Sequence, residues 1–370
     1  MAILFSFFTT AMATAPLPAP PRVNAKAQLL MDYHSGQILA ENNIDTPLEP
    51  ASLTKVMTVY VVANELKEGN ISLENEVVVS EKAWRMSGSR TFIEVNKKIP
   101  LKTLLMGVVI QSGNDASVAL AEHVSGSEEV FVELMNQHSE RLGLKGTHFI
   151  NSTGLPDPNH YTTARDLATL TAALIRDFPE TYALSKIKEF TFNGIVQHNR
   201  NRLLWRDESV DGVKTGHTET AGYCLVASAE RQGMRLISVV LGSATENERE
   251  MATQALLNYG FRFYETHRLY SARQPLTQVR VWKGQVDKAD LGLSEDLYVT
   301  IPRRQYKELN AAMDLESAVI APVEQGQPKG TLKISLKGNE VAKRPLIALQ
   351  SVSEGGFVHR LVDDLRMRWQ

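Results

Sequence analysis

The segment Ala51-Ser-Leu-Thr-Lys-Val-Met57 places Ser52 three residues before Lys55, at the start of an apolar run that follows Pro50. That run predicts a helix over residues 53–66. Residues three apart lie on one face of a helix, so the Lys55 amine can reach the Ser52 hydroxyl. A serine is a weak nucleophile until a base takes its proton, and a lysine does so only when burial or a neighbouring cation lowers its pKa. The segment therefore predicts a serine nucleophile with a lysine as its general base.

Two further motifs follow in the chain, and they distinguish Ser52 from the same spacing at Ser185-Lys-Ile-Lys188, which we interpret as a solvated charge cluster. Ser112-Gly-Asn114 lies at the break between two predicted helices, where Gly113 permits a tight turn that aims two side chains at one point. Lys214-Thr-Gly216 precedes a strand that begins near Gly222. A strand edge of this kind offers N–H groups, a hydroxyl and an ammonium to an extended peptide that ends in a carboxylate, and Gly216 lets the ligand backbone approach.

The rest of the chain shows two kinds of pattern. Residues 22–272 mix strand-like and helical runs, including helices over residues 101–110 and 163–175 and a hairpin turned by Glu230-Arg-Gln-Gly233. This pattern predicts an α/β domain in which an antiparallel sheet is flanked by helices. Residues 273–353 carry short alternating strands such as Thr331-Leu-Lys-Ile-Ser-Leu336, and they predict a small all-β domain.

The two ends of the chain predict export and a surface helix. Residues 1–15 form an apolar run that ends in small residues before a proline cluster, which predicts a secretory signal peptide. No later run approaches the ~18 to 20 apolar residues of a spanning helix. Residues 354–370 predict an amphipathic helix that lies on an anionic membrane surface, and the alternative is a helix docked on its own domain. Its apolar side collects Phe357, Val358, Leu361, Val362, Leu365 and Trp369.

The ordered set Ser-x-x-Lys, Ser-Gly-Asn and Lys-Thr-Gly resembles the signature of penicillin-binding proteins and serine β-lactamases. The wider segments Gln111–Ala116, Asn199–Asn201, Asp211–His217 and Ala221–Tyr223 are similar to the type-5 low-molecular-mass D-alanyl-D-alanine carboxypeptidases. The resemblance implies a serine β-lactamase/DD-peptidase-like domain, no metal or organic cofactor, and removal of the terminal D-alanine from peptidoglycan stem pentapeptide. It also implies covalent binding of β-lactams and a location at the periplasmic face of the bacterial inner membrane.

The resemblance also implies a role for each motif residue. Ser52 would form the acyl-enzyme, Lys55 would be its general base, and Ser112 would relay a proton to the leaving amine. The backbone N–H groups of Ser52 and His217 would form the oxyanion hole. Asp166, at the start of a predicted helix, would cap that helix or orient the site's arginine from a flanking loop. The residues expected to bind substrate are Asn114, Lys214, Thr215, Gly216, His217 and Arg200.

Composition narrows the function further. Lys and Arg total 40 and Asp and Glu total 42, and the net charge of −2 argues against nucleic acid as a partner. The single cysteine, Cys224, excludes an internal disulfide, and we expect an inert buried thiol there. No E-x-x-L-N segment lies between the second and third motifs, which disfavours rapid β-lactam hydrolysis. The alternatives to a carboxypeptidase are a DD-endopeptidase, a weak β-lactamase of the same superfamily, or a catalytically idle wall-binding scaffold.

Overall fold

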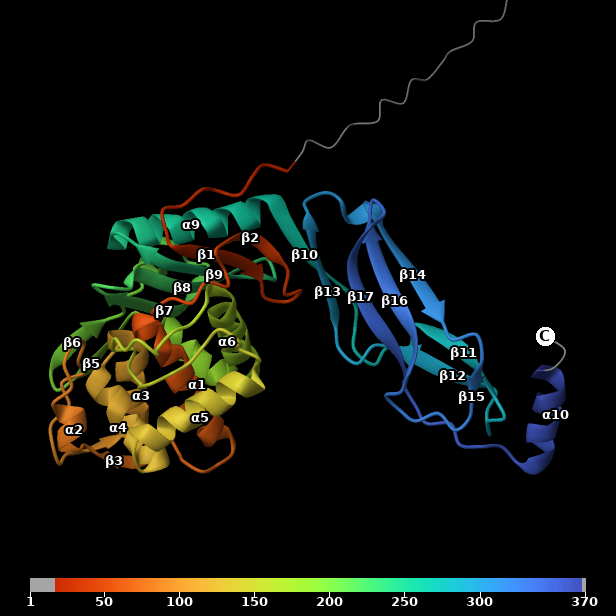
Figure 1. The fold of residues 1–370 in the computed structure, drawn as a ribbon, viewed down its shortest axis with the longest axis horizontal. Coiled ribbons are helices and arrows are strands. Elements are labelled where there is room, and N and C mark those ends of the chain that lie inside the picture. The colour runs from red at the N-terminus through yellow and green to blue at the C-terminus, as the bar shows by residue number, and fades with distance from the viewer. Residues whose placement is uncertain (1–16, 368–370) are drawn as a thin grey trace, which may run out of the picture.

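A five-stranded antiparallel sheet in the order β2-β1-β9-β8-β7 forms the centre of the N-terminal domain of the computed structural model (Figure 1). The model describes residues 17–367, so the expected signal peptide, Arg368 and Trp369 lie outside the described residues. The predicted hairpin is confirmed, because β8 and β9 pair across its turn. The strands are β1 (Ala27–Asp32), β2 (Ile38–Asn42), β7 (Val210–Thr218), β8 (Gly222–Arg231) and β9 (Met234–Ser243).

Helices cover both faces of this sheet. In Figure 1, α9 lies on one side, and α1, α3, α4, α5 and α6 gather on the other. The short helix α8 packs on the α9 side. Successive residues of β8 point to opposite faces of the sheet. Leu225 packs in the core beneath α9, whereas Val226 packs in the core shared with α1, α4 and α6. Because both faces are buried, these strands read as continuous apolar runs rather than alternating ones. The helices are α1 (Lys55–Lys67), α2 (Glu81–Trp84), α3 (Leu101–Met106), α4 (Asn114–Ser125), α5 (Glu128–Arg141), α6 (Ala164–Asp177), α7 (Pro179–Tyr182), α8 (Leu203–Arg206) and α9 (Glu246–Phe263).

The predicted helices are present, with shifted ends. The helix expected from residue 53 begins as α1 at Lys55, after a 3-10 turn over Ala51–Thr54. The helix expected over residues 101–110 is α3 followed by a π-helical turn, Gly107–Gln111. Two short hairpins complete the domain, β3 (Glu76–Val78) with β4 (Lys98–Pro100) and β5 (Glu189–Phe192) with β6 (Ile195–His198).

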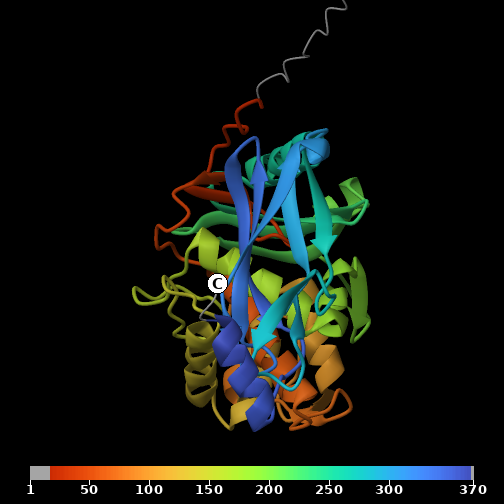
Figure 2. The same cartoon turned by 90° about the vertical axis from the view of Figure 1, so that its right-hand side faces the viewer.

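A separate all-β unit follows α9 and extends to one side of the N-terminal domain, as Figure 1 shows. Figure 2 views the molecule from that side, with the β unit in front. Strand β10 pairs with β13, so the unit begins at Tyr264, before residue 273 where the sequence placed it. The pattern alone hid this strand because β10 directly continues α9, with no intervening turn. The strands are β10 (Tyr264–Tyr270), β11 (Thr277–Trp282), β12 (Lys288–Gly292), β13 (Leu297–Pro302), β14 (Leu309–Leu315), β15 (Val319–Ile320), β16 (Pro328–Leu336) and β17 (Asn339–Ala348).

Polar contacts join the two units. The buried carboxylate of Asp32, at the end of β1, accepts a hydrogen bond of 2.6 Å from the Thr266 hydroxyl on β10. The His34 ring stacks on the Tyr298 ring of β13, with centroids 4.6 Å apart. These contacts lie at one end of the sheet, on the side of the domain away from β7.

The C-terminal helix α10 (Phe357–Met367) docks on the β unit through its polar side. The buried Asp363 carboxylate accepts a 2.6 Å hydrogen bond from the backbone N–H of Lys283, and the Lys283 ammonium pairs with Asp364. The apolar side faces away from the domain, with Phe357 and Val358 about three-quarters exposed. Within residues 17–367 no helix is long and apolar enough to cross a membrane.

Candidate active site

Ser52 lies in the 3-10 turn that leads into α1. The preceding residue, Ala51, takes a left-handed backbone conformation with φ of +47°. The Thr54 hydroxyl holds that turn, because it donates to the Ala51 carbonyl at 2.9 Å and contacts the His160 Nε2 atom at 2.8 Å. Gly154 fits beneath it, where a Cβ atom would lie 1.8 Å from the Ala51 carbonyl oxygen. The nucleophile thus stands on a turn that the Thr54 hydroxyl, His160 and Gly154 hold in place.

Lys55 is completely buried and faces the serine, as the spacing predicted. Its Nζ atom lies 3.0 Å from Ser52 Oγ, 2.7 Å from Asn114 Oδ1 and 2.6 Å from the Thr153 carbonyl oxygen. Burial, with a smaller contribution from the Arg200 guanidinium, lowers the pKa of Lys55 to about 7. A fraction of the amine is therefore neutral near pH 7 and able to accept the serine proton.

The Ser-Gly-Asn motif makes the predicted turn, but with a different residue in the special conformation. Ser112 adopts φ of +68°, whereas Gly113 has an ordinary φ of −62°. Gly113 is needed for close packing, since a Cβ atom there would lie 2.1 Å from the Thr91 hydroxyl. Among residues 17–367 the buried Ser112 Oγ atom finds no hydrogen-bond partner. The turn thus brings an unpaired hydroxyl to the cleft while Asn114 contacts Lys55.

The Lys-Thr-Gly motif lies on β7, the edge strand of the sheet, beside the Ser52 turn. Gly216 lines the cleft, and a Cβ atom there would lie 3.0 Å from the Pro50 carbonyl and 3.2 Å from the Ser52 backbone nitrogen. The glycine therefore also lets the strand itself approach the nucleophile. Lys214 is buried and donates to the Thr215 carbonyl at 3.1 Å. Burial and the nearby Lys55, Arg200 and Arg249 hold the pKa of Lys214 well below its usual range.

A cleft of about 860 Å³ joins these motifs. Residues from all three reach it, together with Arg200 and His217. Arg200 donates from Nε to the Gln111 carbonyl at 3.1 Å, beside Ser112. The His217 ring lies against the Tyr223 ring, with centroids 4.0 Å apart, and forms one wall.

Within residues 17–367, Asp166 has no hydrogen bond or ion pair with Arg200. Its Oδ2 atom accepts hydrogen bonds from the Gly146 N–H at 2.8 Å and the Thr147 hydroxyl at 2.7 Å. The N-cap of its helix is Thr163, whose hydroxyl accepts from the Asp166 N–H. Asp166 is therefore a structural residue that holds a neighbouring loop, because its carboxylate is already occupied there.

Cys224 is buried in β8, and burial raises the pKa of its thiol to about 11. The thiolate is the reactive form of cysteine, so this thiol is unreactive at neutral pH, as expected.

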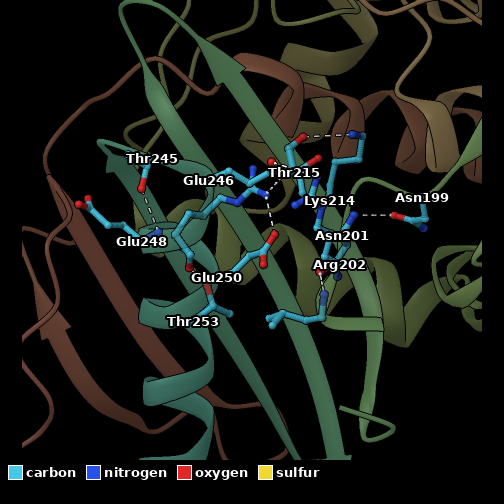
Figure 3. Close-up of polar contacts among 12 residues, drawn as sticks. Asn199, Asn201, Arg202, Lys214, Thr215, Thr245, Glu246, Glu248, Glu250 and Thr253 are labelled. Atoms are coloured by element: carbon cyan, nitrogen blue, oxygen red, sulfur yellow. Dashed lines mark hydrogen bonds and ion pairs between the residues drawn. The ribbon is translucent and has the colours of Figure 1, made fainter. Parts of the chain in front are cut away.

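Sequence reasoning missed Arg249, which reaches the cleft from the first turn of α9. Its guanidinium is 3% exposed, its Nη2 atom lies 3.1 Å from Glu246 Oε1, and its Nε atom has no hydrogen-bond partner among the described residues. Figure 3 shows this end of α9, with Glu246 and Glu250, facing the strand that carries Lys214 and Thr215. The signal was available: Thr245 caps the helix, and an arginine in a first turn opposes the helix dipole. Arg249 therefore lines the cleft as a buried cation that is paired with Glu246 and lies 3.6 Å from Glu250 Oε1.

A serine beside a buried lysine, a turn with a free hydroxyl, and an edge strand with lysine and threonine define a serine acyltransferase site of the penicillin-binding type. The family model for D-alanyl-D-alanine carboxypeptidases matches residues 13–245, and the model for the C-terminal domain of penicillin-binding protein 5 matches residues 264–354. The chain belongs to the D-alanyl-D-alanine carboxypeptidase family. It is a serine-type carboxypeptidase, and the endopeptidase, β-lactamase and scaffold alternatives are not favoured.

Individual relatives agree along the whole chain. D-alanyl-D-alanine carboxypeptidase DacC of Escherichia coli is 47% identical, and the match covers 100% of this chain and 94% of that protein. DacA of the same organism is 43% identical over 95% of this chain and 89% of its own length. The crystal structure of penicillin-binding protein 5 from Haemophilus influenzae superimposes with a TM-score of 0.89 at 43% identity, over 91% of this chain and 100% of that one.

Proposed function

We propose that Ser52 attacks the carbonyl of the terminal D-Ala-D-Ala bond of a peptidoglycan stem pentapeptide while Lys55 accepts its proton. The bond from Ser52 Oγ to the carbonyl carbon forms, and the C–N bond to D-alanine breaks. Ser112 passes a proton to the leaving amine, and water later hydrolyses the acyl-enzyme. The observation that carries this proposal is the buried Lys55 amine 3.0 Å from Ser52 Oγ.

The terminal carboxylate of the substrate meets the cationic end of the cleft. Arg200 and Arg249 line the cleft and bring positive charge there, and Thr215 adds a hydroxyl on the edge strand beside Lys214. Charge-assisted bonds to a carboxylate are about twice as strong as neutral ones, so a free C-terminus is favoured over an amide. The backbone N–H groups of Ser52 and His217 are assigned to the oxyanion, and the close approach of β7 to Ser52 supports that pairing.

Intact-mass analysis after brief incubation with benzylpenicillin tests the nucleophile. One penicilloyl adduct per chain, mapped to the Ser52 peptide and absent from Ser52→Ala, is the expected result. An adduct on another residue, or continuous consumption of the drug with no adduct, contradicts the proposal. Release of D-alanine from a pentapeptide should be lost in the same variant.

We also propose that the enzyme is exported and rests peripherally on the periplasmic face of the inner membrane through α10. The packing of α10 supports this proposal, because its charged side contacts the β unit and its apolar side is exposed. A contiguous apolar stripe exposed on a protein surface marks a binding face, and an amphipathic helix fits a lipid interface. Deletion of residues 356–370 should abolish sedimentation with anionic vesicles, and unchanged sedimentation would contradict the anchor.

A further inference from the structure

The three contacts of the Lys55 amine leave only one direction for its lone pair. A neutral amine has two N–H bonds and one lone pair. The Thr153 carbonyl can only accept, and Asn114 Oδ1 is also an acceptor because the Asn114 Nδ2 group donates to the Ser87 carbonyl at 2.7 Å. Both N–H bonds are therefore occupied, and the lone pair is directed at Ser52 Oγ. The position of the Thr153 carbonyl thus decides whether Lys55 is aimed as a base.

That carbonyl belongs to a short segment that is clamped from two helices. The neighbouring Ser152 is completely buried, and its carbonyl accepts from the Thr58 hydroxyl of α1 at 2.7 Å. On the other side, the Ser152 N–H and hydroxyl both donate to Glu128 Oε1, at 3.0 Å and 2.7 Å. The second Glu128 oxygen pairs with Lys82 at 3.0 Å.

The carboxylate of Glu128 lies where burying a charge is unfavourable for the free energy of folding. Its carboxylate is nearly buried, and burial of a charge must be offset by several hydrogen bonds or ion pairs. A neutral side chain at the start of α5 would avoid that cost. Instead, one carboxylate oxygen of Glu128 accepts two hydrogen bonds from Ser152, the residue that precedes Thr153.

We infer that Glu128 is a positioning residue for Lys55: through Ser152 it fixes the Thr153 carbonyl, which holds one N–H of the amine and aims the lone pair at Ser52. This rests on the proposed role of Lys55 as general base. Glu128 touches neither substrate nor the reacting atoms, and it acts across one peptide unit.

The chain offers a matched control in the next residue. Glu129 also contacts Lys82, at 2.9 Å, but it is exposed and has no hydrogen bond to Ser152 among the described residues. Glu128→Ala and Glu129→Ala each remove one carboxylate from Lys82, but only Glu128→Ala removes the acceptor of the Ser152 N–H and hydroxyl.

The two variants and the wild-type full chain are compared by D-alanine release and by benzylpenicillin acylation from pH 5 to pH 9. We expect kcat of Glu128→Ala to fall tenfold or more with KM within twofold. The acylation midpoint should shift to lower pH, because the Lys55 ammonium loses part of its carbonyl acceptor. A purely structural role would change the melting temperature and the fraction of active sites, but not the rate or midpoint per active site. Glu129→Ala should match the wild type.

Wild-type values of kcat and midpoint in folded Glu128→Ala would overturn the inference. If that variant fails to fold, Ser152→Ala, which removes only the hydroxyl donor, decides instead: a smaller change in the same direction supports the clamp, and no change refutes it. Lys55→Ala separates this question from the mechanism itself. Undiminished acylation in Lys55→Ala would refute the base assignment whatever Glu128→Ala does.

Discussion

The Nζ atom of Lys55 lies 3.0 Å from the Oγ atom of Ser52, inside a core where the lysine has no contact with solvent. Burial disfavours the ammonium form, and the Arg200 guanidinium adds repulsion, so the pKa of Lys55 falls to about 7. Burial thus destabilises the ammonium form of Lys55, and for the same reason it makes the neutral amine available as a base near pH 7.

Acylation by benzylpenicillin should therefore rise with pH through a midpoint near 7, because only neutral Lys55 accepts the serine proton. Lys55→Arg keeps a positive charge but cannot lose its proton, so its acylation rate should fall by about 10² to 10⁴. Stopped-flow or quenched-flow acylation rates measure both effects. A profile that is flat from pH 5 to pH 9 would show that Lys55 is not the base.

Arg249→Gln should weaken recognition of the substrate carboxylate. Loss of a hydrogen bond to a charged group costs about 1.5 to 3 kcal/mol, which corresponds to about 10- to 100-fold in kcat/KM. Arg206→Gln is the matched control, since Arg206 pairs with Glu250 at 2.7 Å next to Arg249 but does not line the cleft. Equal losses in the two variants would assign Arg249 to packing rather than to substrate. A peptide substrate with a C-terminal amide should be insensitive to Arg249→Gln.

The main site could be predicted from sequence because its residues lie in short local motifs. Ser52 and Lys55 are one helical turn apart, and Ser112 and Asn114 are two residues apart, so local geometry alone brings each pair together. Arg249 could not be placed in this way, because its path to the cleft depends on how α9 packs on the sheet. The β unit was predicted to begin at residue 273 rather than at Tyr264 for a similar reason, since the pairing of β10 with β13 is a long-range property.

The Ser-Gly-Asn motif and Asp166 show a second limit to prediction from the sequence. The sequence correctly places a turn at Ser112-Gly-Asn114, but the left-handed residue is the serine, and Gly113 serves the packing of Thr91. Asp166 likewise keeps its helix position but binds Gly146 and Thr147. Residue type and spacing predict which positions matter, whereas the identity of the contacting partner depends on tertiary packing.

His160 should make the protein less stable in acid. Burial lowers the pKa of its imidazole to about 4, below the value of about 6.5 in an unfolded chain. Between these values the unfolded state binds a proton that the folded state refuses, so stability falls as pH drops from 6.5 to 4, by about 3 kcal/mol in total. Urea unfolding across that range should show a shallower loss in His160→Gln. An unchanged slope in His160→Gln would contradict this assignment.

Gly154→Ala should damage the nucleophile turn far more than an equivalent change elsewhere. Gly154 and Gly126 both have left-handed backbones, with φ of +85° and +80°, so both substitutions carry a conformational cost of about 1 to 2 kcal/mol. Only at Gly154 would the new Cβ atom collide with the Ala51 carbonyl, and no atom lies within 4 Å at Gly126. Unfolding free energy and acylation rate should both fall further in Gly154→Ala than in Gly126→Ala. Equal effects would mean that the Ala51 turn adapts freely.

Leu361→Asp should detach the enzyme from lipid without unfolding it. Leu361 lies in the exposed stripe of α10, while Asp363 and Asp364 on the opposite side bind Lys283, so the substitution leaves the docked side intact. Removal of one leucine forfeits about 1.5 to 3 kcal/mol of burial, and the added carboxylate is repelled by anionic headgroups. Binding to vesicles that contain phosphatidylglycerol should therefore weaken at least tenfold. Val286→Asp, a half-exposed valine of the β unit outside α10, is the control and should bind as wild type. If Val286→Asp releases the protein and Leu361→Asp does not, the lipid-facing surface lies on the β unit rather than on the helix.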